Sequence, residues 1–356
     1  MAERERNAPG QVGILRPTSF DIARKAGVSQ PTVSRALRGD PTISDITRRR
    51  IAFIAKELGY KVDKNASNLR GRHAQTIAVL FFEDHSSAVS LINPFFLSML
   101  GSISQSCSAR GYDLLISLQH TSSNWRTDYE DTRKADGIIL LGYDDFLAYR
   151  TQLEQMAELG TKFVHYGAAL DGHPGPSVGC DDYQSGLMAT RHLLALGRRR
   201  IAFLGYASPR YPEFGGRYRG YADALREAGL EVPVELQADA VSSIGSGEKA
   251  AREVIAGGGK FDAIFAASDL IAIGALTVLK EHGVAVPGDV SVVGFDDIPA
   301  ASIVAPQLTT VMQDTRLAGE TLVDTLIKLM RDESADDTLL PTRLIVRESC
   351  GARPAK

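Results

Sequence analysis

The chain has 356 residues, 44% hydrophobic and 23% charged, a composition typical of water-soluble proteins with room for two or three domains. No run approaches the roughly 18 apolar residues of a membrane span, and the first ten residues lack the apolar core of a signal peptide. We therefore expect a cytoplasmic protein with no membrane partner. Cys107, Cys180 and Cys350 lie far apart, outside any CxxC spacing, which predicts buried free thiols and no zinc site.

Charge is distributed unevenly along the chain. The first 73 residues carry 15 Lys and Arg against 7 Asp and Glu, whereas the remainder carries 25 against 36. A basic head on an acidic body suggests that the head meets a polyanion.

In the basic head, the sequence predicts a disordered arm over residues 1–17 and a three-helix unit over 18–61, because apolar periodicity and capping signals begin at Thr18. Thr18 and Asp21 form a capping box, and Gly27 permits a tight turn. Ser29 can cap the second helix by accepting from the amide of Thr32, with Pro31 in the first turn.

The second helix directs polar side chains away from its packing face. Val33 and Leu37 can pack on the first helix, which leaves Gln30, Pro31, Ser34 and Arg35 pointing outward. In a helix-turn-helix this face enters the major groove, where Gln pairs with adenine, Arg with guanine and Ser with either. The sequence therefore predicts a surface that reads double-stranded DNA.

A third helix is predicted between Ser44, its cap, and Gly59, its end. Its expected core residues are Ile46, Ile51, Ile54, Ala55 and Leu58, and its phosphate-binding candidates are Arg48, Arg49 and Arg50.

The stretches "TSFDIARKAGVSQPTVSRALRGD" and "ISDITRRRIAFIAKELGY" resemble the DNA-binding headpiece of the LacI/GalR family of bacterial regulators. The resemblance implies that "NASNL", within a hinge or linker over 62–75, forms a helix whose Leu69, with Ala66 beside it, wedges into the minor groove. Val62-Asp63 departs from the family's usual Pro-Asn at the start of this hinge. The residues expected at the DNA are Thr18, Ser29, Gln30, Pro31, Thr32, Ser34, Arg35, Ala66 and Leu69.

The body, residues 76–349, alternates short apolar runs with helical stretches in two sets, which predicts an α/β core of two lobes with parallel sheets. Ligands of such folds lie beyond the carboxyl ends of the strands. The residues there supply aromatic faces, an arginine and several carboxylates, a combination that suits a sugar or a planar nitrogenous base. These strand-end segments are Asn93–Phe96, His165–Tyr166, Asp181–Asp182, Phe214–Tyr221, Ser268–Asp269 and Gly294–Asp297. Asp269 is also a candidate cap of the helix that follows it.

The family resemblance extends to about Ser349 and implies a core similar to periplasmic sugar-binding proteins, with three crossovers between the lobes and a dimer interface. Arg217 and Asp296 match the family's effector anchors, and Phe96, Tyr166, Asp269 and Gln313 match positions that line the pocket. A long stretch over 83–92 and a compressed one over 120–135, which contains Trp125, depart from the family pattern.

Enzymatic interpretations find little support. "GSGEKA" at 245–250 fits a dinucleotide fingerprint but follows no clear strand, and no metal-spaced Cys/His group or nucleophile motif is found in the sequence. We expect no enzyme, no cofactor and no metal.

Together these features predict a transcriptional repressor that binds a pseudo-palindromic operator as a homodimer and responds to a small-molecule effector, a sugar, between the core lobes. The alternatives are a sugar-binding protein without a regulatory role and a regulator that responds to a purine or another metabolite.

Overall fold

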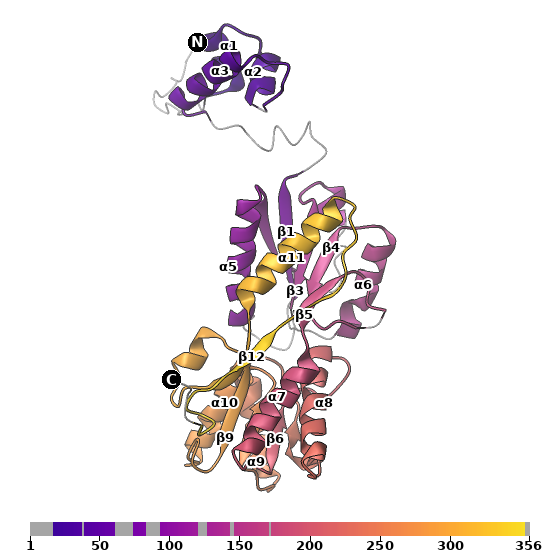
Figure 1. Ribbon diagram of the computed structural model, residues 1–356, viewed down its shortest axis with the longest axis vertical. Helices are drawn as coiled ribbons and strands as arrows, with labels where there is room; N and C mark the ends of the chain where they lie inside the picture. The colour runs from indigo at the N-terminus through magenta and orange to yellow at the C-terminus, as the bar shows by residue number, and fades with distance from the viewer. Residues whose placement is uncertain are drawn as a thin grey trace, which may run out of the picture. The chain divides into compact units, whose positions relative to one another are not determined.

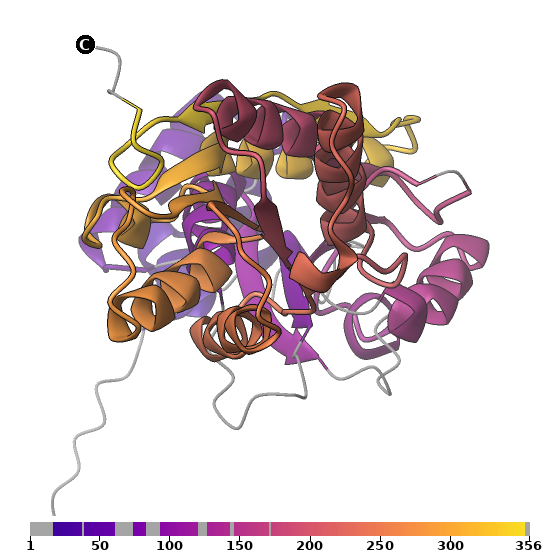
Figure 2. The same cartoon turned by 90° about the horizontal axis from the view of Figure 1, so that it is seen from below.

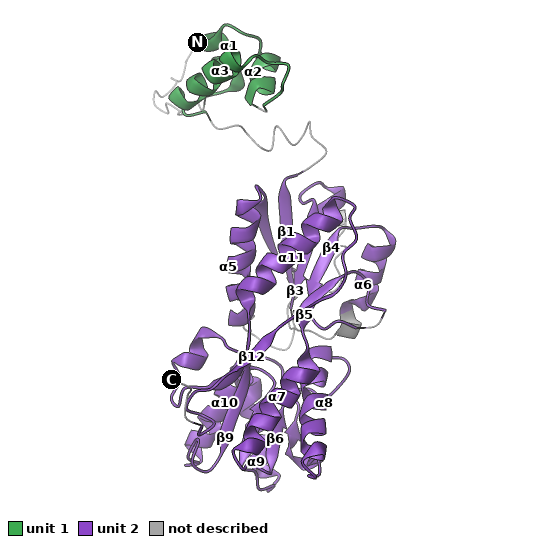
Figure 3. Cartoon of the chain, in the orientation of Figure 1, with its two compact units in different colours: residues 1–72 green, residues 73–356 purple. Residues whose placement is uncertain are grey.

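The computed structural model divides the chain into two compact units, residues 1–72 and 73–356 (Figure 3). It describes residues 17–37, 39–60, 74–82, 93–119, 127–142, 146–170 and 172–352. Residues 1–16 of the predicted arm, residues 62–73 of the predicted hinge with Ala66 and Leu69, Trp125 and the stretch 83–92 lie outside these described residues.

In the described part of the first unit the helices are α1 (Ser19–Ala26), α2 (Gln30–Leu37) and α3 (Asp45–Glu57). Ile22, Val33 and Ile51 are fully buried at its centre. The Thr18 amide donates to the Asp21 carboxylate at 2.9 Å, so the predicted capping box is present. Gly27 adopts a φ of 62° at the turn, a conformation that favours glycine.

One predicted core residue of the first unit is wrong. Ile46 is 82% exposed, whereas Ile43 is buried. Helix α3 begins at Asp45, after its Ser44 cap, and its inward stripe starts at Ile51, so Ile46 lies on the outer side of the first turn. The segment that leads into the helix supplies the missing apolar contact through Ile43.

The first lobe of the second unit is a six-stranded sheet in the order β11-β5-β4-β3-β1-β2, with all its pairs parallel (Figure 1). Helices α5 and α11 pack on one face with Ile77 and Val79, and α6 packs on the other with Ala78 and Leu80. The strands are β1 (Thr76–Phe82), β2 (Asp113–Gln119), β3 (Gly137–Leu141), β4 (Phe163–Tyr166), β5 (Ser177–Cys180) and β11 (Thr338–Leu340). The helices are α5 (Pro94–Ala109), α6 (Phe146–Glu158) and α11 (Thr315–Met330), with a π-helical turn at Thr127–Asp131.

The second lobe repeats this plan with the order β12-β10-β9-β8-β6-β7, in which β12 alone is antiparallel to its neighbour. Helices α7 and α8 cover one face of the sheet, and α9 and α10 cover the other (Figure 2). The strands are β6 (Ile201–Leu204), β7 (Gln237–Ala238), β8 (Ala263–Ala266), β9 (Ser291–Asp296), β10 (Thr309–Gln313) and β12 (Thr342–Ile345). The helices are α7 (Asp182–Ala195), α8 (Pro212–Glu227), α9 (Ile244–Ala256) and α10 (Asp269–Glu281), with 3-10 turns at Val234–Leu236 and Pro299–Ser302.

The chain passes between the lobes three times, as predicted: after Cys180, after Gln313 and at Pro341. The lobes also touch directly, because Ile298 of the second lobe is buried in the apolar core of the first. All three cysteines are free and buried, which confirms the prediction for them. None of the described helices is both long and apolar enough to cross a membrane.

Candidate DNA-binding and effector-binding sites

The predicted DNA-reading face of α2 is present but not uniformly free. Pro31 and Arg35 are exposed, whereas Gln30 and Ser34 are half-buried. The Gln30 Nε2 donates to Ser19 Oγ at 3.1 Å, which ties the start of α2 to the start of α1. Pro31 and Arg35 are therefore the side chains of this face most available to a partner.

Two further predicted DNA contacts build the turn before α2. Ser29 Oγ accepts from the Thr32 amide at 3.4 Å, and the two hydroxyls lie 2.8 Å apart. This cap satisfies the Thr32 amide and fixes the first turn of α2.

Of the three arginines in α3, Arg48 serves the fold of the first unit. Its Nη2 donates to the carbonyl oxygen of Ile43 at 3.0 Å, and the side chain is half-buried. Arg49 and Arg50 are exposed. The phosphate candidates are therefore Arg49 and Arg50 rather than all three.

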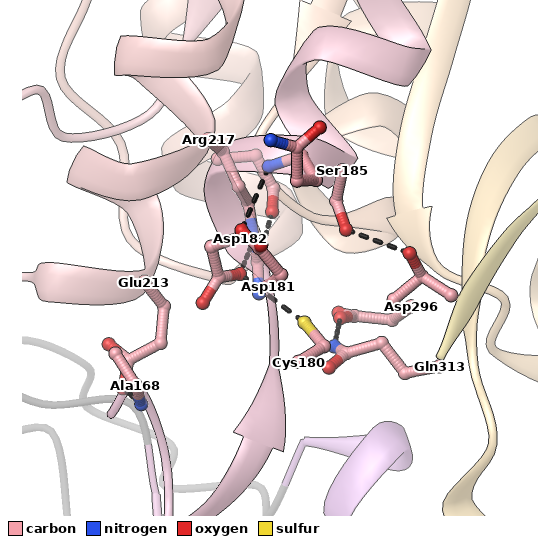
Figure 4. A network of polar contacts seen from close by, with 12 residues as sticks. Ala168, Cys180, Asp181, Asp182, Ser185, Glu213, Arg217, Asp296 and Gln313 are labelled. Carbon is pink, nitrogen blue, oxygen red and sulfur yellow. Dashed lines mark hydrogen bonds and ion pairs between the residues drawn. The ribbon is translucent and has the colours of Figure 1, made fainter. Parts of the chain in front are cut away.

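In the second unit, Arg217 lies at the centre of a buried polar network (Figure 4). Its Nε donates to Asp182 Oδ1 at 2.8 Å, and its Nη1 donates to the carbonyl oxygen of Ala267. The guanidinium carbon lies 3.6 Å from the centroid of the Phe295 ring, within cation–π range. Arg217 is thus held on two edges and one face.

Close contact between α7 and α8 positions this arginine. A Cβ added to Gly186 would lie 2.2 Å from the carbonyl oxygen of Arg217, and one added to Gly220 would lie 2.1 Å from that of Tyr183. Neither position can hold a side chain unless the backbones move apart. Glycine at these two sites therefore sets how deeply Arg217 reaches toward the second sheet.

Asp296 ends strand β9 in a backbone conformation that is unusual for a side-chain-bearing residue. Its φ is 111°, and that of Asp297 is 57°. Such strain persists where the surrounding structure enforces it, and it concentrates at functional sites. Burial raises the pKa of Asp296 to about 7, with Arg217 acting in the opposite direction.

A chain of contacts leads from Asp296 into the first lobe. Gln313 donates to Asp296 Oδ1 at 2.8 Å and accepts from the Tyr166 hydroxyl at 2.6 Å. The Tyr166 ring meets Phe96 edge-on, with centroids 6.2 Å apart. The structure therefore brings these four predicted residues together from four separate elements.

Asp269 is the first residue of α10 and contacts the loop that follows β9. Ser268, not Asp269, caps α10, since its side chain accepts from the Ile271 amide. The two Asp269 oxygens accept from the Thr310 hydroxyl at 2.6 Å and the Ile298 amide at 2.9 Å. Both bonds fix the strand-to-loop turn, so Asp269 supports the site from behind.

Sequence reasoning missed Glu213, which lies in the first turn of α8 and is 8% exposed. Its Oε1 accepts from the amide of Ala168 in the first lobe at 3.1 Å. Burial, together with the nearby Asp182, raises its pKa to about 7. The available signal was its position four residues before Arg217, which places both on one helix face.

The motif "GSGEKA" has a structural explanation. It lies inside α9, where a Cβ on Gly247 would come 2.3 Å from the carbonyl oxygen of Ile271 in α10. Gly247 therefore allows α9 and α10 to pack closely, whereas a Cβ on Gly245 would meet no atom within 4 Å. Among the described residues, no group of three or more His, Cys, Asp or Glu side chains is arranged to hold a metal ion.

Comparison with known proteins identifies two regions of the chain. Residues 20–63 match the family described as bacterial regulatory proteins, lacI family, and residues 190–350 match a periplasmic binding protein-like domain. The transcriptional regulator CelR of Thermobifida fusca is 33% identical over 94% of this chain and 98% of its own length. The repressor PurR of Erwinia tasmaniensis is 30% identical over 95% and 98%.

Solved structures give the same picture. A complex of CelR with cellobiose is similar with a TM-score of 0.70 and 31% identity, covering 94% of this chain and all of that one. A lac repressor dimer bound to operator and the anti-inducer ONPF has a TM-score of 0.79 at 24% identity and covers 94% and 99%. At that identity the second likeness concerns the fold alone.

Proposed function

Because the chain belongs to the LacI family of bacterial regulatory proteins, we propose that it represses transcription and that a sugar sets its affinity for operator DNA. Its membership makes it a DNA-binding transcriptional regulator and not an enzyme. That it represses transcription, and that its effector is a sugar, are our proposals.

In this proposal two copies of the chain bind the two halves of a pseudo-palindromic operator, one headpiece to each half-site. Arg35 and Pro31 read bases in the major groove, and Arg49 and Arg50 hold phosphates. The remaining contacts come from Thr18, Ser29, Gln30, Thr32 and Ser34 of the headpiece and from Ala66 and Leu69 at the minor groove. DNA binding then belongs to the headpiece unit 18–61 and effector binding to the core 76–349, with the linker 62–75 between them.

One observation carries the effector proposal: the hydrogen-bonded chain from Asp296 through Gln313 to Tyr166, which joins the two lobes beside Arg217. Carboxylate, amide and guanidinium groups next to the Phe96 and Tyr166 rings suit a polar ring with apolar faces. Asp269 supports the loop that carries Asp296. A ligand that prefers one lobe arrangement shifts the equilibrium between lobe arrangements only by its difference in affinity.

Fluorescence anisotropy with operator DNA tests the proposal. Operator fragments are selected from a random library with the full-length protein and then titrated with mono- and disaccharides, purine bases and nucleosides. We expect a sugar to change operator affinity at least tenfold. A response only to purines or nucleosides contradicts the sugar, and sugar binding without any change in operator affinity contradicts the regulatory role.

A further inference from the structure

Resting on the proposed function, we infer that the effector carries no negative charge: the site takes an uncharged or amine-bearing sugar and rejects sugar acids and sugar phosphates. Glu213 is the residue that sets this charge selectivity.

The first argument is the composition of the buried charges. Within the described residues, the buried side chains of Arg, Lys, Asp and Glu are one guanidinium, Arg217, and four carboxyl groups, Asp182, Glu213, Asp269 and Asp296. A proteinaceous site for a phosphate or a carboxylate usually offers a surplus of cations or unpaired donors. This one offers a surplus of acceptors.

The second argument is that the arginine is already engaged. Its Nε is paired with Asp182 at 2.8 Å, its Nη1 donates to a carbonyl oxygen, and its face lies on Phe295. An anionic ligand would have to compete with a buried carboxylate for the same guanidinium. A hydroxyl or ammonium group, in contrast, can donate to carboxyl oxygens such as those of Glu213 and Asp296 and does not compete with Asp182 for the guanidinium.

The third argument separates Glu213 from Asp182 and Asp269, and from Asp296, which accepts from the Gln313 amide within its own lobe. Asp182 is paired with Arg217, and both oxygens of Asp269 accept hydrogen bonds from the protein's own Thr310 and Ile298. Glu213 has no cation as a hydrogen-bond partner, and its bond to Ala168 crosses from the second lobe to the first. Glu213 lies one helical turn before Arg217 on α8 and interacts electrostatically with Asp182 and Arg217, so its charge also acts on a ligand bound next to Arg217.

The size of the effect follows from Coulomb's law. Two like charges about 6 Å apart in a medium with an effective dielectric constant of about 20 repel each other by an amount equivalent to roughly 100-fold in affinity. Removal of the Glu213 charge should recover a large part of that factor for an anionic sugar and leave an uncharged sugar much less affected.

The test uses the full-length protein and matched sets of sugars that differ only in charge: glucose, glucosamine, glucuronate and glucose 6-phosphate, with the corresponding galactose and cellobiose derivatives. Thermal shift and calorimetry at pH 8, above the pKa of about 7 of Glu213, give the affinities. We expect the uncharged or amine-bearing member of a set to bind at least tenfold more tightly than its anionic counterparts. Glu213→Gln should raise the relative affinity for glucuronate about tenfold, whereas Glu227→Gln, on the exposed end of the same helix, should leave it unchanged.

Tighter binding of any anionic member overturns the inference, as does the absence of binding by every uncharged and amine-bearing sugar. The wild-type comparison decides even if the Glu213 variant is unstable. An anionic sugar that alters operator affinity overturns the charge selectivity and leaves the regulatory proposal intact. An uncharged sugar that binds without altering operator affinity overturns the regulatory proposal and leaves the charge selectivity intact.

Discussion

Arg217 and Asp182 form an ion pair in which both side chains are almost completely buried, 1% and 6% exposed, with 2.8 Å between Nε and Oδ1. The pair joins α8 to the start of α7, directly after the first crossing between the lobes. Removal of one partner from such a pair leaves an uncompensated charge without water around it, which costs more than removal of both.

Asp182→Ala should therefore destabilise the second unit by about 3 to 5 kcal/mol. The double variant Asp182→Ala/Arg217→Met should lose less than the sum of the two single changes. Urea unfolding followed by circular dichroism measures both. Glu320→Ala, which breaks the exposed 2.9 Å pair with Arg316, serves as the control and should cost less than about 1 kcal/mol.

Stability should fall as the pH rises from 6.5 to 8. Burial raises the pKa of Glu213 and of Asp296 to about 7, from ordinary values of 4.5 and 3.8. The folded state then holds more protons than the unfolded state, so its stabilisation is complete below about pH 4 and is lost as the pH passes through 7. Each group should contribute a loss of about 1 kcal/mol over this range.

Glu213→Gln and Asp296→Asn should each flatten that pH dependence, and Glu227→Gln should not. Burial lowers the pKa of His165 to about 3, which acts with the opposite sign and offsets part of the loss until the unfolded imidazole, with an ordinary pKa of 6.5, has lost its proton. Variants whose free energy of unfolding depends on pH as the wild type's does would show that neither carboxyl is protonated in the folded state.

The glycine contacts between α7 and α8 predict a stability effect of a different kind. Gly186→Ala should destabilise the second unit by about 1 to 3 kcal/mol or more, because the new methyl group meets the backbone oxygen of Arg217. Gly101→Ala, inside α5 with no atom within 4 Å of the added Cβ, should instead stabilise by about 0.5 to 1 kcal/mol. Thermal unfolding of the two variants measures the difference, and equal midpoints would contradict the close approach.

Asp296→Asn should abolish the effector response and leave operator binding largely unchanged. The substitution keeps the shape of the side chain and removes its charge, so ligand hydroxyls lose a charge-assisted acceptor worth roughly 1 to 3 kcal/mol. Operator titrations with and without the effector measure the response. Asp332→Asn is the control, since Asp332 also has a positive φ but pairs on the surface with Lys162. A normal response from Asp296→Asn would place the anchor elsewhere.

In the headpiece, Arg35→Ala and Arg49→Ala should weaken DNA binding in different ways. Loss of Arg35 should cost about 1 to 3 kcal/mol at one operator position and relax the base preference there. Loss of Arg49 should weaken all sequences alike and reduce the salt dependence of binding. Binding to a randomised operator library at several salt concentrations separates the two. A uniform loss for Arg35→Ala would reject base reading by this residue.

Most of the fold could be predicted from the sequence because the signals for helices and strands are local. Capping at Thr18 and Ser44 and the apolar runs of β1, β3, β6 and β8 depend only on neighbouring residues, and the structure contains each of them. Ile46 was misplaced because it lies five residues before Ile51, outside the spacing of three and four residues that defines the inward face of α3. The short strands β11 and β12 were missed because they have few buried side chains.

The candidate site was harder to predict than the fold. Strand ends pointed to Asp296 and Tyr166, but the bond between Gln313 and Asp296 or the pairing of Asp182 with Arg217 depends on tertiary packing that no spacing reveals. Gln30 shows the same limit, since its bond to Ser19 joins residues of two helices. Sequence patterns thus placed side chains on elements, and only the structure gave their partners.

The burial of Ile298 within the first lobe has an energetic consequence for lobe motion. Exposure of such a side chain to water costs about 1.5 to 3 kcal/mol. The packed arrangement is therefore favoured by roughly 10- to 150-fold over one in which the lobes separate at this point. A ligand that required the separated arrangement would have its apparent affinity reduced by that factor. An effector that binds with Ile298 still buried therefore keeps its full intrinsic affinity. One that binds only when Ile298 is exposed to water loses the free energy of burying that single isoleucine side chain.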